Sequence, residues 1–383
     1  MEQRDDGALN ILVLDQAMDP AAPRISRRSF CKVAAGVGLA AAGSSFLAAC
    51  ARLGGRQTAP QELAKELNFY NWSDYIAEDT LPNFQKRFGV KVNYDNYSSN
   101  DTLFAKLRAG ATNYDIVVPT DYLVRRMLRL NMLEELNLAN IPNRKNLDAR
   151  FQNPPYDPGN KHSIPWQWGT TGIGYNTKRV AESVESWAML WNAKYRGKIS
   201  MLAEMRDALG ATLILLGFSG SSTKAEELEA AKAKMLEQKP LLKHYTSDTY
   251  IDELASNDVW LAQGWSGDVF QAQGENKDVD YVIPKEGSFI WVDNMVIPKG
   301  APHKYTAEVF MNYVLEAEVG AAISNFVRYA SPNKAAEAHL DKDLLADTRV
   351  YPSSQVMDAL QFYGDLGPAE TLWNKIWQEV RAG

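Results

Sequence analysis

The stretch Tyr114-Asp115-Ile116-Val117-Val118-Pro119 is a short apolar run that ends at a proline, and it predicts a buried β-strand. Two further strands are predicted before it, at residues 67–70 and 90–94. Helices with their apolar residues on one face are predicted in between, at 79–88 and 101–109. Strands that alternate with helices in this way are typical of a parallel sheet covered by helices. The sequence therefore predicts an α/β fold.

The same alternation continues toward the C-terminus. Further strands are predicted at 199–202, 259–263 and 289–292, and further helices at 122–133, 206–217, 224–238 and 303–324. A chain of 383 residues is longer than one hydrophobic core usually serves. We therefore expect two α/β domains.

The composition is that of a globular protein, with 45% hydrophobic and 23% charged residues. The formal net charge of −6 argues against nucleic acid as a partner. Both cysteines, Cys31 and Cys50, lie near the N-terminus, so the body of the chain carries no disulfide framework and no cysteine-based metal site. The four histidines lack the spacing of a helical metal site. We expect neither a metal nor a cofactor.

The first fifty residues have the pattern of an export signal. Ser26-Arg27-Arg28-Ser29-Phe30 resembles the twin-arginine type, and the apolar run after it ends in Leu47-Ala48-Ala49-Cys50. That ending resembles a lipoprotein cleavage box, whose cysteine is lipidated and becomes the new N-terminus. A transmembrane helix is the alternative, but the run at 33–49 is too short and too rich in Gly and Ala to span ~30 Å. We predict a signal at 1–50 and a tether at 51–66.

Acids, aromatic rings and hydroxyls follow nearly every predicted strand. Ligands of open α/β sheets bind just beyond the carboxyl ends of the strands, so these positions are candidates for a binding site. Arg206 is the one basic residue at these positions. Carboxylates pair with ammonium groups, and aromatic faces hold cations and methylene chains. The pattern favours an organic cation and suits a linear polyamine, which has charged ends and an apolar middle.

Single residues of this pattern also have structural interpretations. Asp74 and Asp121 can each cap the helix that follows, and for Asp121 we favour that role. Trp166 and Trp168 can belong to the hydrophobic core. The binding-site interpretation therefore depends on the whole set of strand ends and not on any one acid.

Other chemistry is less well supported. The glycines at 169–174 lack a P-loop lysine and indicate a hinge strand instead of a phosphate cradle. The sequence Gly264-Trp265-Ser266-Gly267 is one residue short of a nucleophile elbow. The paired acids Glu204 and Asp207 leave an envelope hydrolase as a remote alternative. With no redox or nucleophilic constellation, we expect a binding protein and not an enzyme.

Six stretches of the body carry a family resemblance. From about Leu67 to the C-terminus, the chain resembles the spermidine/putrescine-binding proteins of bacterial polyamine ABC transporters. The stretches are Asn71-Trp72-Ser73-Asp74-Tyr75, Tyr114-Asp115-Ile116-Val117-Val118-Pro119-Thr120-Asp121-Tyr122, Ser163-Ile164-Pro165-Trp166-Gln167-Trp168-Gly169, Gly264-Trp265-Ser266-Gly267-Asp268-Val269, Ile283-Pro284-Lys285-Glu286-Gly287 and Tyr329-Ala330-Ser331-Pro332-Asn333. Six such motifs in the same order are highly specific.

The resemblance implies a bilobed periplasmic-binding-protein fold of type II, with a ligand cleft and a hinge between two α/β lobes. One lobe is expected to consist of 67–173 plus 293–340, and the other of 174–292 plus 341–383. The chain is expected to cross between the lobes near 172–176 and near 291–294.

The resemblance also implies thirteen ligand-binding residues. In the family's motifs, Asp293 matches the acid that holds an ammonium group, and Trp72 and Tyr122 match aromatic walls of the cleft. The full set is Trp72, Ser73, Asp74, Tyr75, Thr120, Tyr122, Glu204, Asp207, Trp265, Asp268, Trp291, Asp293 and Tyr329.

The same motifs imply the ligand and its partners. Asp74 and Asp268 resemble putrescine-type members, whereas Glu204 with Asp207 leaves room for spermidine. The implied function is to capture a polyamine in the periplasm, as a monomer held to the membrane only through Cys50, and to deliver it to an inner-membrane ABC permease. A binding protein for another organic cation and a ligand-sensing lipoprotein remain alternatives.

Overall fold

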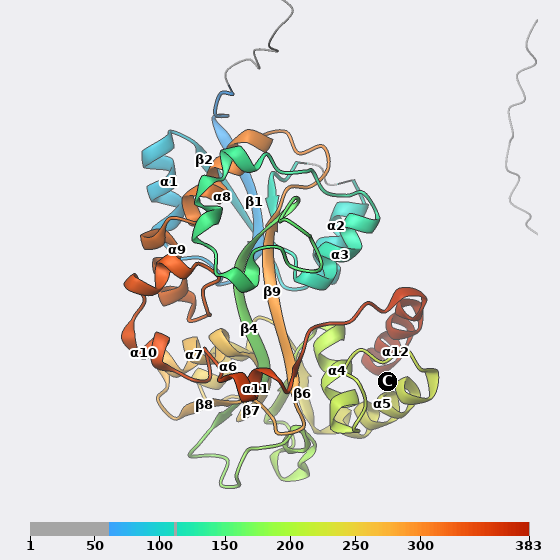
Figure 1. Ribbon diagram of the computed structural model, residues 1–383. Coiled ribbons are helices and arrows are strands. Elements are labelled where there is room, and N and C mark those ends of the chain that lie inside the picture. The colour runs from blue at the N-terminus through green and yellow to red at the C-terminus, as the bar shows by residue number, and fades with distance from the viewer. Residues whose placement is uncertain (1–60, 111–112, 383) are drawn as a thin grey trace, which may run out of the picture. The chain divides into compact units, whose positions relative to one another are not determined.

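The computed structural model describes residues 61–110 and 113–382 (Figure 1). These residues belong to one unit, Pro60–Gly383. The predicted signal at 1–50, with the lipidation site at Cys50, lies outside the described residues, as do residues 51–60 of the predicted tether.

Three parallel strands form the first part of the sheet. β1 (Glu66–Trp72) lies between β2 (Lys91–Tyr97) and β3 (Ile116–Val117), and Trp72 pairs with Tyr97 where β1 and β2 end. The carboxyl ends of these strands therefore meet at one edge. The helices of this part are α1 (Thr80–Phe88), α2 (Asn100–Arg108), α3 (Asp121–Arg129), α8 (Lys304–Val314) and α9 (Ala317–Val327).

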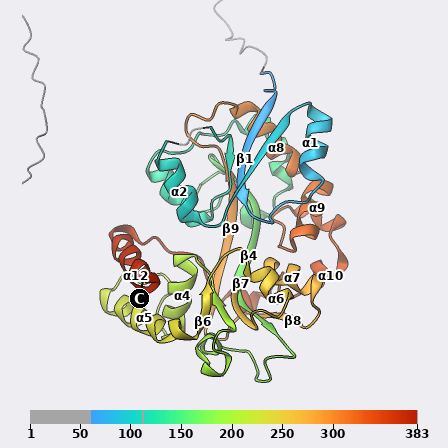
Figure 2. The same cartoon turned by 180° about the vertical axis from the view of Figure 1, so that it is seen from behind.

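A second group of parallel strands has β5 (Ile199–Met201) between β7 (Leu261–Trp265) and β6 (Leu242–Tyr245). Two sets of helices flank it on opposite sides in both views (Figure 1 and Figure 2). One set is α4 (Met205–Leu215), α5 (Ala225–Gln238) and α12 (Glu370–Ala382), and the other is α6 (Tyr250–Ala255) and α7 (Ser266–Glu275).

Two long antiparallel strands, β4 (Ser163–Asn176) and β9 (Ser288–Val296), join the two groups. The strand order is β2-β1-β3-β9-β4-β7-β5-β6. β8 (Val279–Val282) pairs with β4, and the short β10 (Leu360–Gln361) pairs with β9. Two short helices, α10 (Lys342–Ala346) and α11 (Ser354–Met357), precede β10.

The glycines at 169–174 lie within β4 and allow close packing. A Cβ added to Gly172 would lie 2.4 Å from the carbonyl oxygen of Val282, and one added to Gly174 would lie 2.8 Å from the side chain of Val269. Only glycine lets these neighbours approach so closely. The run is thus a strand, as predicted, and its glycines are explained by packing without a phosphate.

Trp166 and Trp168, also in β4, belong to the core. They are 3% and 1% exposed. The ring of Trp166 lies 6.1 Å from that of Phe69 in β1, and the ring of Trp168 lies 6.0 Å from that of Phe151. The structural interpretation of these two tryptophans is confirmed.

The α/β fold class is confirmed, with two corrections to the details. The sheet is mixed, because β4 and β9 run antiparallel to each other. The prediction of a single helix at 303–324 was wrong, because α8 ends at Val314 and α9 begins at Ala317. Glu316 between them has extended backbone (ψ 142°), which apolar periodicity alone does not reveal. The predicted residue bounds of the two lobes stay a prediction.

Candidate functional site

A cavity with about 590 Å³ of empty space lies beyond the carboxyl ends of β1, β2, β5, β6 and β7. All thirteen residues that the sequence predicted as ligand contacts lie in its wall. They are Trp72, Ser73, Asp74, Tyr75, Thr120, Tyr122, Glu204, Asp207, Trp265, Asp268, Trp291, Asp293 and Tyr329. The structure therefore brings the set together, and its role in binding a ligand stays a prediction.

Seven further residues line the cavity that sequence reasoning missed. Three of them lie at the end of β2 or just after it; because β2 continues to Tyr97 and not only to residue 94, the rule of strand ends would have found them. The others follow β6, a strand that was not predicted, or lie in α6 or after the two-residue β10. The seven are Tyr97, Ser98, Asn100, Ser247, Asp248, Ile251 and Tyr363.

Asp293, in β9, is 5% exposed and is held by two hydroxyl groups. The Oγ1 of Thr120 donates to its Oδ1 at 2.7 Å, and the hydroxyl of Tyr75 donates to its Oδ2 at 2.9 Å. Burial raises the pKa of Asp293 to about 7, against the lowering effect of both hydrogen bonds. This carboxyl group is oriented and costly to charge without a cation nearby.

Glu204 and Asp207 lie at the start of α4. Glu204 caps the helix by position, and its Oε1 accepts a hydrogen bond from the backbone N–H of Asn100 at 2.8 Å. The Oδ1 of Asp207 accepts from the hydroxyls of Thr171 and Tyr363, both at 2.6 Å. Burial raises the pKa of Asp207, and it raises the pKa of Glu204 well above its usual range.

Asp268, in the first turn of α7, is a fourth oriented acid. Its two carboxylate oxygens accept hydrogen bonds from the hydroxyls of Tyr250 and Tyr329, both at 2.6 Å. Burial raises the pKa of Asp268 to about 6, and the carboxyl groups of Asp74 and Asp248 add to the shift. These three acids therefore lie within electrostatic range of one another.

No lysine or arginine lines the cavity, and among the described residues none of its six acids forms an ion pair. Arg206, 4% exposed, lies behind the wall. Its guanidinium is 4.9 Å from the ring centre of Tyr122 and 5.4 Å from that of Tyr363, and it donates to the carbonyl of Gly364 at 2.7 Å. Among the described residues, no cation therefore neutralises the acids that line the cavity.

Aromatic rings make up much of the remaining wall. The rings of Trp72 and Trp265 meet edge to face at 5.6 Å, and Tyr329 contacts both Tyr75, at 5.2 Å, and Trp291, at 5.3 Å. The indole N–H of Trp72 donates to a backbone carbonyl at 2.9 Å, which fixes the ring. Fixed rings beside carboxylates can hold both the charged and the apolar parts of an organic cation.

Neither Asp74 nor Asp121 is the N-cap residue of the helix that follows it, so the capping interpretation was wrong for both. Asp74 does not cap α1, because Asp79 is at that position. Thr120 precedes α3, and Asp121 is the first residue of that helix. The Oδ2 of Asp121 accepts from the backbone N–H of Val292 at 3.1 Å, so this acid joins α3 to β9 and does not line the cavity.

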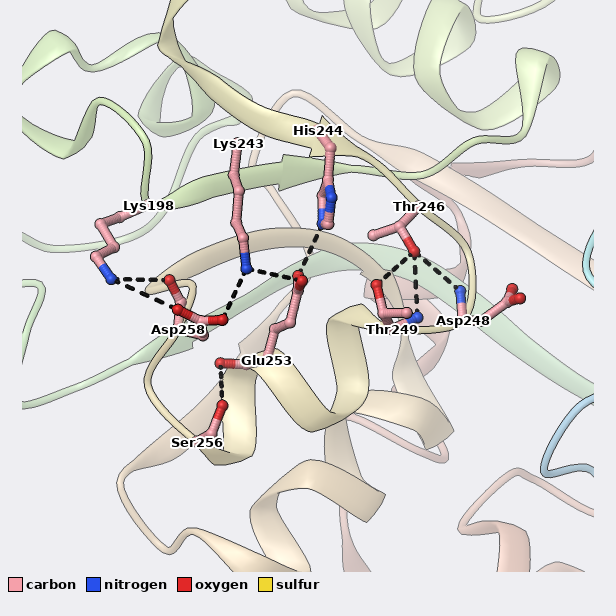
Figure 3. A network of polar contacts seen from close by, with 9 residues as sticks. All are labelled: Lys198, Lys243, His244, Thr246, Asp248, Thr249, Glu253, Ser256 and Asp258. Atoms are coloured by element: carbon pink, nitrogen blue, oxygen red, sulfur yellow. Dashed lines mark hydrogen bonds and ion pairs between the residues drawn. The ribbon is translucent and has the colours of Figure 1, made fainter.

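Ser247 and Asp248, in the loop between β6 and α6, line the cavity. Figure 3 shows Thr246, Asp248 and Thr249 of this loop. The Oγ1 of Thr246 accepts hydrogen bonds from the backbone N–H groups of Thr249, at 3.1 Å, and of Asp248, at 3.4 Å. The Oγ of Ser247 accepts from the backbone N–H of Ala203 at 3.1 Å. The loop is therefore held in one shape.

In the part of the chain that the structure describes, no three His, Cys, Asp or Glu residues converge so that they could hold a metal ion. None of the helices there is both long enough and apolar enough to cross a membrane.

Known proteins resemble this chain over most of its length. The model of the bacterial extracellular solute-binding protein family matches residues 81–350. The chain is 34% identical over 342 residues to the spermidine/putrescine-binding periplasmic protein of Escherichia coli (strain K12), which covers 88% of this chain and 98% of that protein. It is 36% identical over 340 residues to a putrescine-binding periplasmic protein of Pseudomonas aeruginosa (strain UCBPP-PA14), which covers 83% and 92%.

A solved structure supports the fold. The chain matches a spermidine/putrescine ABC transporter protein from Listeria monocytogenes with a TM-score of 0.80 and 35% identity, over 83% of this chain and 99% of that one. This likeness confirms the predicted periplasmic-binding-protein fold class. These relatives are transport proteins and not enzymes, which argues against the hydrolase alternative. This chain belongs to the bacterial extracellular solute-binding proteins.

Proposed function

We propose that this protein captures a polyamine, putrescine or spermidine, in the cavity between its two groups of strands and delivers it to the permease of an ABC transporter. One observation carries the proposal. Six carboxyl groups and eight aromatic rings line the cavity, no lysine or arginine does, and the described residues offer these acids no ion pair. A linear polyamine supplies the missing cations and an apolar chain to lie against the rings.

The energetics of the buried acids support the same ligand class. Isolated buried charges are costly, and burial raises the pKa of Asp293, Asp207 and Glu204. A bound ammonium group offsets this cost and donates hydrogen bonds to carboxylate oxygens that are already oriented. The names of the E. coli and P. aeruginosa relatives, which bind spermidine or putrescine, support polyamines over other organic cations.

The thirteen predicted residues are proposed as ligand contacts within this function. Asp293 would hold one ammonium group, Glu204 with Asp207 a second, and Asp74 with Asp268 a third position. The rings of Trp72, Tyr75, Tyr122, Trp265, Trp291 and Tyr329 would flank the methylene chain, and Ser73 and Thr120 would add hydroxyl contacts.

Calorimetric titration of the purified protein tests the proposal. Bound ligand is first removed by unfolding and refolding. Putrescine, cadaverine, spermidine and spermine are then titrated, with arginine and glycine betaine as controls. We expect tight one-to-one binding of at least one polyamine, and the order of affinities decides between putrescine and spermidine. A folded sample that gives no heat with any polyamine, or that binds only a control, would rule the proposal out.

Export and anchoring belong to the same proposal. Its relatives are periplasmic proteins, and Cys50 would hold this one to the membrane as a monomeric lipoprotein. Metabolic labelling with a fatty acid is expected to mark the wild type and not the Cys50→Ser variant. Uptake of labelled polyamine should fall in a strain that lacks the protein; unchanged uptake despite tight binding would favour a sensing role.

A further inference from the structure

The six acids of the cavity differ in how deeply they lie. Four are at most 8% exposed, and two are exposed at the mouth. The buried ones are Glu204, Asp207, Asp268 and Asp293, and the exposed ones are Asp74 and Asp248. The two exposed acids come from opposite groups of strands, since Asp74 follows β1 and Asp248 follows β6.

Asp248 is presented to the cavity by a braced loop. Its backbone is fixed by Thr246, as described above, and its carboxylate points away from the surrounding polar network (Figure 3). The helix that follows is held to β6 because Glu253 accepts from Lys243 at 2.8 Å and contacts His244 at 2.9 Å. No described residue donates a hydrogen bond to the Asp248 carboxylate, so its oxygens stay free for a ligand.

The carboxyl groups near the mouth lie close enough for their charges to interact. Partial burial raises the pKa of Asp248, and the charge of Asp74 adds to that shift. Asp74 and Asp248 in turn both raise the pKa of Asp268. Three carboxyl groups in mutual repulsion, with no cation among the described residues beside them, are relieved when a cation enters between them.

We propose that Asp248 is a specificity-determining residue that, with Asp74, holds an ammonium group of a triamine or tetraamine at the mouth of the cavity. The inference rests on the proposed function. Asp293 and the pair Glu204 and Asp207 are enough for both ends of a diamine. A third charge would lie beside Asp268 and Asp74, and Asp248 brings a further carboxylate to that position.

Titration of the Asp248→Asn variant with putrescine, spermidine and spermine tests this role. Asparagine keeps the size of the side chain, and the hydrogen bonds that hold the loop do not use the carboxylate. We expect the ratio of spermidine affinity to putrescine affinity to fall about two- to fivefold, the size of a partly exposed ion pair. Asp248→Lys, which places an ammonium group at the same point, should lower the ratio further.

Asp252→Asn is the matched control, because Asp252 is exposed on α6 and does not line the cavity. It removes the same charge nearby and should leave all affinities unchanged. If Asp248→Asn lowers the affinity for all three amines equally, Asp248 attracts cations in general and does not set specificity. If no affinity changes, Asp248 does not contact the ligand. Either result overturns the inference. The proposed function fails separately, if the wild type binds no polyamine.

Discussion

Two groups of acids in this protein lie close together and differ in their partners. Around α6, Glu253 and Asp258 are each paired with a base: the Nζ of Lys243 lies 2.8 Å from both (Figure 3). In the cavity, the four buried acids accept hydrogen bonds from hydroxyls or backbone N–H groups, as Asp293 does from Thr120 and Tyr75. An acid of the α6 network already has a basic partner in the free protein, whereas the buried cavity acids are oriented but have no ion-pair partner among the described residues.

This difference separates stability from binding. Removing an acid of the α6 network breaks partly exposed ion pairs and should change only stability. Removing an acid of the cavity should change mainly the affinity for a cation. The following experiments test that separation, from the largest expected effect to the smallest.

Asp293→Asn is expected to have the largest effect. Loss of one partner from a buried, hydrogen-bonded charge pair costs about 2–5 kcal/mol, so polyamine affinity should fall at least ~30-fold. The amide can still accept a hydrogen bond from Thr120 and keeps the shape of the site. Calorimetric titration measures the loss, and wild-type affinity in this variant would remove Asp293 from the site.

Lowering the pH should weaken binding in the same way. The pKa of Asp293 is raised to about 7 and that of Asp268 to about 6, and a bound ammonium group favours their charged forms. Binding should therefore release protons, and affinity should fall about ten- to a hundredfold from pH 7.5 to 5.5. Titrations at both pH values, in buffers with different ionisation enthalpies, measure the affinity and the protons released.

In the ligand-free protein, Asp293 and Asp268 should make the folded state more stable as the pH falls. Their pKa values are higher in the folded than in the unfolded state, so the folded state holds more protons at pH 5.5 to 7. Their contribution to the free energy of unfolding should thus grow as the pH falls through that range.

The affinity measurements decide the protonation state of these acids in the free protein. Affinity that does not depend on pH would show that these acids are charged before the ligand arrives.

Trp265→Ala should lower the affinity for every polyamine by about two- to thirtyfold, the equivalent of ~0.5–2 kcal/mol for one cation–π contact. The ring of Trp265 packs edge to face against Trp72, and both line the cavity. Titration with putrescine and spermidine measures the loss. If the affinity for only one of the two ligands falls, the ring contacts a part of the polyamine that only that ligand places there, and it is not a contact common to all polyamines.

Glu253→Gln is expected to have the smallest effect. It removes a partly exposed ion pair with Lys243 and a contact with His244, which should lower the free energy of unfolding by about 1 kcal/mol. Polyamine affinity should stay at the wild-type value, because Glu253 does not line the cavity. Denaturant unfolding and titration of the same sample check both parts. A large loss of affinity here would mean that the network itself positions the ligand-binding loop.

Much of the candidate site followed from local patterns. β1, β5 and β7 were predicted as strands, and acids and rings stand at their ends or shortly after them, so Asp74, Asp207 and Trp265 could be placed at the carboxyl ends of strands. The six family motifs then added residues such as Tyr329. Each of these positions is marked by its immediate neighbours in the chain.

Four of the seven residues that were missed, those outside the end of β2, have no such marker. Asp248 follows β6, whose sequence Leu242-Lys243-His244-Tyr245 has too few apolar residues to predict a strand. Tyr363 follows a two-residue strand that exists only because it pairs with β9. Their places in the wall come from contacts with distant segments, which no local pattern encodes.

The sequence by itself determined the alternation of strands and helices, and it determined that acids and rings follow the strands. Only the tertiary structure decided which acids are neutralised. Glu253 and Asp293 are both carboxylic acids, yet folding places Lys243 beside the first and Thr120, 173 residues away in the chain, beside the second. Burial and long-range contacts set the charge that each group can carry, and these depend on the folded chain as a whole.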